Sequence, residues 1–92
     1  MNDNDNNDNN VAELELEPEM ITMDGYDDCI IGVCRRFGQP SIVAYDRDKV
    51  IAKLMKDGLD YEGAEEWFEF NQIGAWWGDS TPCFISLGRL VR

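Results

Sequence analysis

Carboxylates are the side chains of this sequence with the clearest capacity for chemistry. They form two groups, one of three aspartates (Asp24, Asp27 and Asp28) and one of four glutamates (Glu62, Glu65, Glu66 and Glu69). Either group could hold a divalent metal for hydrolysis. The 92 residues contain no histidine, however, so the commonest general base is missing. There is no glycine-rich phosphate loop and no serine nucleophile elbow. We therefore predict a protein that is not an enzyme and has no cofactor, with a metal-dependent enzyme as the weaker alternative.

The other candidate metal ligands are three cysteines and an Asn/Asp tract. Cys29, Cys34 and Cys83 lack the spacing of a zinc site, and no histidine completes the set. Residues 4–15 partly match a calcium-binding loop, but the first ligand, Asn4, is uncharged and the required glycine is missing. We predict no metal site, and small, reduced, buried thiols.

The negative charge is unevenly distributed along the chain. Residues 1–19 contain seven acids and no base, whereas residues 20–92 contain twelve acids and eight bases, which gives charges of −7 and −4. We expect residues 1–19 to form a disordered Asn/Asp/Glu-rich tail and residues 20–92 to form a single small domain. Direct nucleic-acid binding is not expected, because phosphates require clustered Lys and Arg. The expected partner is a protein with a basic surface.

No apolar run approaches the length of a membrane-spanning helix, and no basic segment precedes an apolar signal region. We therefore expect no membrane association and a location in the cytoplasm.

The acids are positioned by a predicted α+β domain with three helices on a two- or three-stranded sheet, in the order α-β-α-α-β. Hydrophobic spacing predicts helices at 25–37, 47–57 and 61–74, and β-branched runs predict strands at 41–45 and 83–87. Residues 19–23 could add an edge strand. Asp46 and Asp60 are expected to cap the second and third helices.

The third helix has two faces with different predicted roles. Ala64, Trp67, Phe68 and Ala75 form its apolar stripe, and the four glutamates lie opposite, within an arc of about 100°. Asn71 falls at the centre of the apolar stripe. We predict that it is a buried structural amide that bonds a neighbouring strand or turn, with the base of a ligand pocket as the alternative.

The segment after this helix is a tight turn containing Trp76, Trp77 and Asp79. The two tryptophans point in different directions, so we expect one to seal the core and the other to be exposed as a contact residue.

A resemblance to known proteins is carried by three segments: DDCIIGVCRRFGQP, YDRDKVIAKLMKDG and YEGAEEWFEFNQIGAWWGDSTPCFI. The chain resembles a group of small, largely uncharacterised tailed-bacteriophage proteins over residues 24–85. The resemblance implies a viral origin and expression in an infected bacterium. It assigns no activity and no site residue. The Asn-rich tail and Gly63 depart from the group's pattern.

These observations together predict a small viral accessory protein that acts by protein–protein interaction in the host cytoplasm, and virion association stays open. The predicted contact surface combines the glutamates of the third helix with the Trp76–Asp79 turn. The alternative is an acidic mimic of nucleic acid that inhibits a host defence or nucleic-acid enzyme. The partner would be a host or viral protein with a basic surface.

Overall fold

The computed structural model describes residues 13–73 and 77–92, and over this part of the chain the protein has the predicted α+β class. The elements in chain order are η2 (Asp27–Cys29), β2 (Ile30–Arg36), β3 (Gln39–Asp46), α1 (Arg47–Lys56), α2 (Tyr61–Phe68), η3 (Glu69–Ile73) and β4 (Cys83–Ile85). Here η2 is a 3-10 turn, and η3 is a π-helical turn that continues α2.

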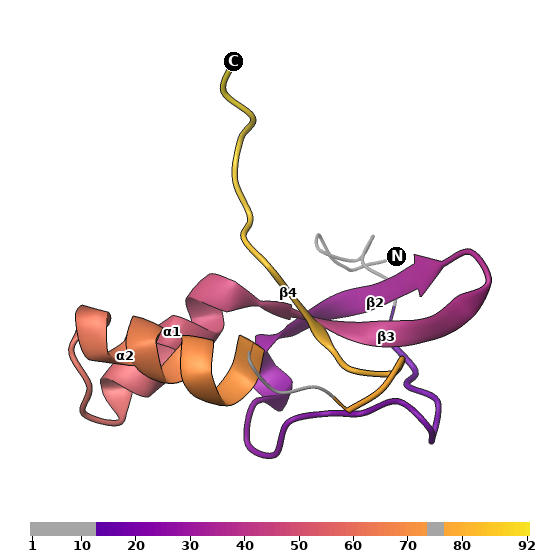
Figure 1. Ribbon diagram of the computed structural model, residues 1–92, viewed down its shortest axis with the longest axis horizontal. Helices are drawn as coiled ribbons and strands as arrows, with labels where there is room; N and C mark the ends of the chain where they lie inside the picture. The colour runs from indigo at the N-terminus through magenta and orange to yellow at the C-terminus, as the bar shows by residue number, and fades with distance from the viewer. Residues whose placement is uncertain (1–12, 74–76) are drawn as a thin grey trace, which may run out of the picture.

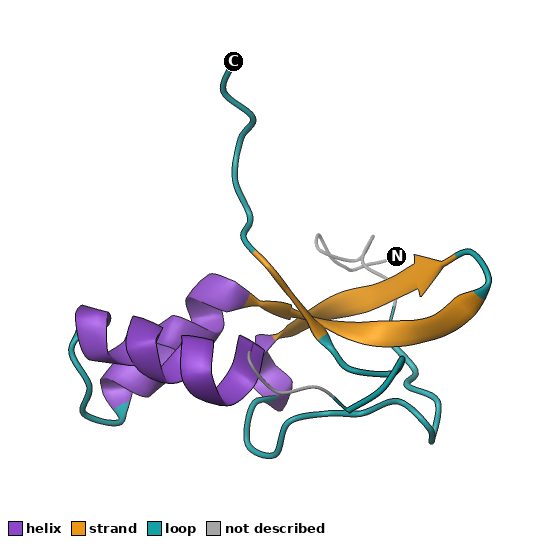
Figure 2. Ribbon diagram, viewed as in Figure 1, coloured by secondary structure: helices purple, strands orange, loops and turns teal. Residues whose placement is uncertain are grey.

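The three strands form one mixed sheet in the order β2-β3-β4. β2 and β3 are an antiparallel hairpin, and β4 runs parallel to β3, with Cys83 opposite Ala44. Parallel neighbours need a crossover, which α1 and α2 provide. Figures 1 and 2 show the two helices gathered at one end of the hairpin, with β4 crossing beside β3.

The predicted first helix, residues 25–37, is wrong. Ile30–Arg36 is strand β2, preceded only by the short turn η2. Gly38, the residue directly after the predicted helix, has φ of +71° and lies in the two-residue loop between Arg36 and Gln39. A positive φ suits a helix end and a hairpin turn equally. The β-branched residues of the segment favour the strand, and the order of the described elements is β-β-α-α-β.

Both remaining helices begin where the sequence predicts. The Asp46 carboxylate accepts hydrogen bonds from the backbone N–H groups of Asp48 and Lys49 at 2.9 and 3.3 Å. The Asp60 carboxylate accepts one from Gly63 N–H at 2.7 Å. These bonds satisfy donors that the first helical turn leaves free.

The core lies where the base of the hairpin meets the two helices. Tyr45 of β3 stacks on Phe84 of β4 at 5.7 Å, and Phe84 meets the edge of Phe68 of α2 at 4.9 Å. The Arg47 guanidinium lies over the Phe68 ring at 5.5 Å. This aromatic stack, Tyr45–Phe84–Phe68 with Arg47, joins the sheet to both helices, and Tyr45 and Phe68 are fully buried.

The segment before η2 packs against the core without forming a strand. Residues 13–19 are exposed, whereas Met23 is buried and Met20 lies against the core. The predicted edge strand at 19–23 is therefore wrong, since this stretch is irregular chain. Met23 N–H donates a hydrogen bond of 2.7 Å to the Tyr45 hydroxyl, which fixes the segment to β3.

Removal of that hydroxyl provides a test of the core. We expect Tyr45→Phe to lower the free energy of unfolding by about 1–3 kcal/mol, because it leaves the buried Met23 N–H without an acceptor. Urea denaturation measures the change. Tyr26→Phe is the matched control, because the Tyr26 hydroxyl makes no hydrogen bond within the described residues, and it should have a smaller effect. Equal effects of the two substitutions would contradict the assigned bond.

Candidate functional site

The glutamates of α2 and η3 gather on one side of the helix, as predicted. Together with Phe70 they line a shallow hollow of about 260 Å³, and the lining residues are Glu62, Glu65, Glu66, Glu69 and Phe70. Phe70 is 83% exposed, so a large aromatic ring lies in water beside the carboxylates. Exposed rings of this kind are typical anchors in protein interfaces.

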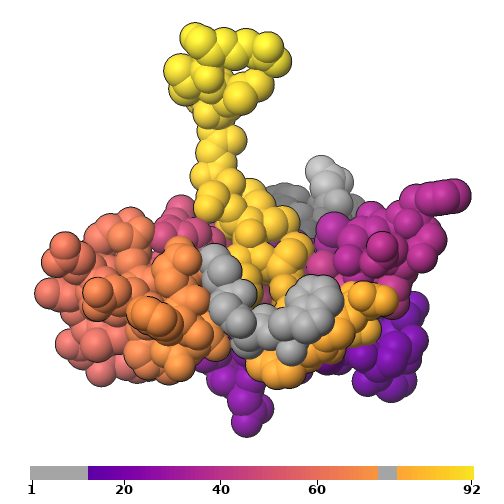
Figure 3. Space-filling model, in the orientation of Figure 1, coloured from indigo at the N-terminus to yellow at the C-terminus, as the bar shows by residue number. Residues whose placement is uncertain are grey.

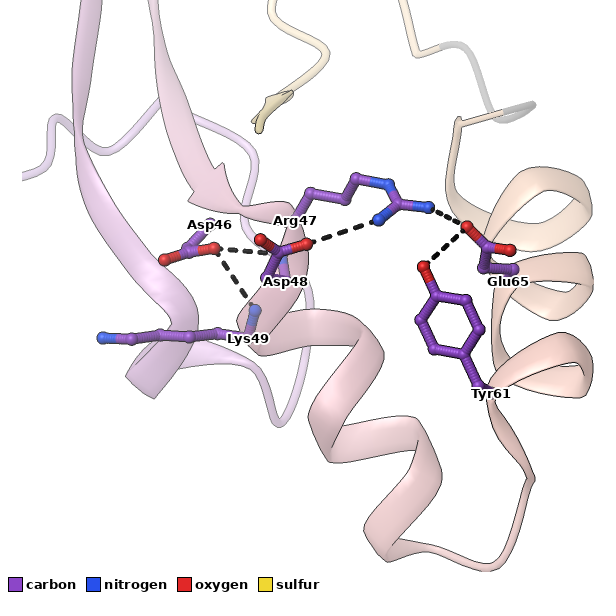
Figure 4. Close-up of polar contacts among 6 residues, drawn as sticks. All are labelled: Asp46, Arg47, Asp48, Lys49, Tyr61 and Glu65. Carbon is purple, nitrogen blue, oxygen red and sulfur yellow. Dashed lines mark hydrogen bonds and ion pairs between the residues drawn. The ribbon is translucent and has the colours of Figure 1, made fainter. Parts of the chain in front are cut away.

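Glu65 is the member of this group that has a structural role. Its carboxylate accepts a hydrogen bond from Arg47 Nη2 at 2.7 Å and another from the Tyr61 hydroxyl at 3.1 Å (Figure 4). The hydrogen bond from Arg47, followed by that from Tyr61, lowers the pKa of Glu65. The same contact raises the pKa of Arg47. Glu65 therefore ties α2 to the start of α1.

The other three glutamates remain available. Glu62, Glu66 and Glu69 are exposed, and their carboxylates form no ion pair with any residue of the described segments. Among the lysines of α1, Lys53 pairs with a different acid, since its Nζ lies 3.0 Å from the Asp28 carboxylate. That contact lowers the pKa of Asp28. We call Glu62, Glu66, Glu69 and Phe70 the α2 acidic face.

The prediction that Asn71 is buried is wrong. Asn71 is exposed, and its Nδ2 donates to the Trp67 carbonyl oxygen at 3.1 Å on the same helix. On this helix the buried polar residue is Gln72, whose Oε1 has no partner within the described residues. The π-helical turn η3 explains the difference, because an i→i+5 turn contains an extra residue and moves the inward direction one position along.

The aromatic residues of this helix follow the predicted faces only in part. Phe68 is fully buried, as predicted, but Trp67, expected in the apolar stripe, is 41% exposed. Phe70 belongs to no predicted site. Its position four residues after Glu66, on the glutamate side of an ideal helix, is the signal that could have identified it.

The Trp77–Thr81 segment is a compact turn, as the sequence predicts. Trp77 N–H donates to Thr81 Oγ1 at 2.7 Å, and that hydroxyl donates to the Gly78 carbonyl oxygen at 2.7 Å. Trp77 and Asp79 are exposed. Trp76 and Ala75 lie outside the described residues.

The turn and the α2 acidic face are fixed to opposite ends of β3. Arg36, opposite the first residue of β3, donates to the Asp79 carbonyl oxygen at 2.6 Å. Arg47, directly after the last residue of β3, binds Glu65 at 2.7 Å. At about 3.3 Å per residue, the strand between them is roughly 25 Å long. The glutamates and the turn therefore form two surfaces.

The candidate metal ligands do not converge within residues 13–73 and 77–92, where no group of three His, Cys, Asp or Glu side chains is arranged to hold an ion. The cysteines are free, with Cys29 buried. Burial, together with the neighbouring Asp28, raises the pKa of Cys29. Over the same part of the chain, no helix combines the length and apolar character needed to cross a membrane.

Comparison with known proteins gives no relative from which a role could be transferred. The chain matches no family model, and it has no significant match among curated proteins or among solved structures.

The pairing of Glu65 predicts a pH dependence of stability. Its pKa in the folded protein lies below its ordinary value of about 4.3, so the pair stabilises the fold above that pH. This stabilisation is lost as the pH falls through the lower, folded value. We expect Glu65→Gln to destabilise the protein at neutral pH and to differ little from wild type in strong acid. Urea unfolding at several pH values measures this difference.

Glu66→Gln is the control, since it removes a carboxylate that has no ion pair within residues 13–73 and 77–92. A Glu65→Gln effect that stays constant down to strong acid would show that the Arg47 pair does not contribute as described.

Proposed function

We propose that this chain is a non-enzymatic binding module whose α2 acidic face contacts a protein with basic residues around an apolar group. The observation that carries this proposal is that Glu62, Glu66 and Glu69 line the same shallow hollow as the exposed ring of Phe70. An exposed phenylalanine supplies apolar contact area, and the carboxylates attract and orient a basic partner.

Contacts on the other sides of α2 hold the α2 acidic face in a fixed position, which favours binding of a partner. Phe68, on the opposite side of the helix, is locked against Phe84, and Glu65 is held by Arg47 at the flank. The helix is thus fixed from behind and from one side, whereas Glu62, Glu66 and Glu69 stay in water. A surface that is already ordered loses little conformational entropy when a partner binds.

The Trp77–Asp79 turn is proposed as a second, separate contact. Its backbone is braced by Thr81 and by Arg36, and the Trp77 ring is exposed. A partner that reaches both surfaces would have to extend along β3.

Acidic mimicry of nucleic acid is the second candidate, favoured by the row of carboxylates at 62, 66 and 69 along one side of the helix. A mimic would use the charges alone, whereas the binding module also needs Phe70. The proposed setting, a bacterial cell infected by a tailed phage, is supported by the sequence resemblance.

Affinity capture from a bacterial lysate with quantitative mass spectrometry tests these proposals. We expect wild type to enrich a protein that is lost both with Glu62→Lys/Glu66→Lys/Glu69→Lys and with Phe70→Ala. Loss with the charge reversals alone, together with strong salt dependence, would favour mimicry. Trp77→Ala tests whether the separate Trp77–Asp79 turn also contributes to capture of the partner.

The matched control is Glu13→Lys/Glu15→Lys/Glu17→Lys, which changes the net charge equally but lies outside the α2 acidic face. A partner retained by all the α2 variants, or lost equally with the control, would refute the assigned surface.

A further inference from the structure

The last segment of the chain exposes apolar side chains without covering them. Residues 86–92 continue from β4, and Figures 1 and 3 show the segment projecting from the body of the molecule. Leu87, Leu90 and Val91 are 59%, 73% and 86% exposed. Aliphatic groups left in water at this density favour association with another surface.

The charge of this segment is opposite to that of the α2 acidic face. Its charged side chains are Arg89 and Arg92, both exposed, and neither forms an ion pair with a residue of the described segments. The α2 acidic face presents three carboxylates that have no counter-ion among the described residues, and one exposed aromatic ring. Segment and face thus each contain the charge and the apolar group that the other requires.

The dimensions of the two surfaces also match. In an extended polyproline-II-like chain, the three-residue step from Arg89 to Arg92 covers roughly 9 Å and returns both side chains to the same side. On a helix, the seven-residue step from Glu62 to Glu69 covers about 10 Å. The two arginines can therefore meet Glu62 and Glu69 at the two ends of the carboxylate row, and Phe70, one residue beyond Glu69, lies at one end of that row beside the apolar side chains of the segment.

We propose that residues 87–92 of one copy of this chain bind the α2 acidic face of a second copy, and that the contact is reciprocal. A reciprocal exchange uses the same two surfaces twice and closes as a two-fold dimer. The segment projects from the body and does not return to its own α2 in Figure 1. The inference rests on the proposed function, since it takes the same face as the binding surface and names a second copy as its occupant.

Charge reversal combined with mixing tests the exchange. Sedimentation equilibrium of the wild-type chain should show a concentration-dependent dimer. Arg89→Glu/Arg92→Glu alone, and Glu62→Arg/Glu69→Arg alone, should each be monomeric. An equimolar mixture of the two variants should dimerise again. In the mixed dimer, the wild-type face of the segment variant meets the wild-type segment of the face variant, and the reversed face meets the reversed segment.

Arg35→Glu/Lys56→Glu is the matched control, since it changes the net charge as the segment variant does but alters exposed residues elsewhere. It should dimerise like wild type. Circular dichroism of every variant checks folding.

Three outcomes would overturn the exchange: a wild-type chain that is monomeric at all concentrations, a dimer that persists in Arg89→Glu/Arg92→Glu, or a mixture that stays monomeric. The lysate capture tests the proposed function independently of the dimer. If the wild type is monomeric but lysate capture still depends on Glu62, Glu66, Glu69 and Phe70, only the self-association is wrong. If capture is also independent of these residues, both proposals fail.

Discussion

The aromatic stack of Tyr45, Phe84 and Phe68, with Arg47 over its last ring, is the contact on which the rest of this small structure depends. It joins β3, β4, α2 and the start of α1 through ring contacts of 4.9 and 5.7 Å and one cation–π contact of 5.5 Å. A domain of this size has few core residues, so large rings account for much of its buried area. Because Phe68 points into this stack, the glutamates on the opposite side of α2 must face water. Arg47 then secures the helix a second time through Glu65.

The elements with a strong local signal could be predicted from the sequence. Asp46 and Asp60 cap α1 and α2 as expected, and the β-branched run at 41–45 lies within β3. The segment at 30–36 could not be assigned as easily, since its apolar residues fit a helical stripe as well as a strand. Its conformation depends on pairing with β3, for example Val33 with Val43, which is a tertiary contact that local spacing does not report.

The positions of the charged residues in the candidate site could be predicted from the sequence, whereas the exposure of its apolar residues could not. The glutamates at 62, 65, 66 and 69 share a face because ideal helical geometry holds through Phe68. Beyond that residue the π-helical turn shifts the register, so Gln72 is buried in place of Asn71. The separation of the Trp77 turn from the glutamates also required the fold, because only β3 shows that Arg36 and Arg47 lie at opposite ends of one strand.

The most direct test of the central claim, that the α2 acidic face binds basic and apolar segments, is an NMR titration. The peptide SLGRLVR, which has the sequence of residues 86–92, is added to the Arg89→Glu/Arg92→Glu chain, whose own segment no longer competes. The account predicts saturable shifts of the amide signals of residues 62–70, with the signals of 77–79 and of the hairpin tip at Phe37 unchanged. Unchanged signals at 62–70, or shifts confined to other parts of the molecule, would contradict it.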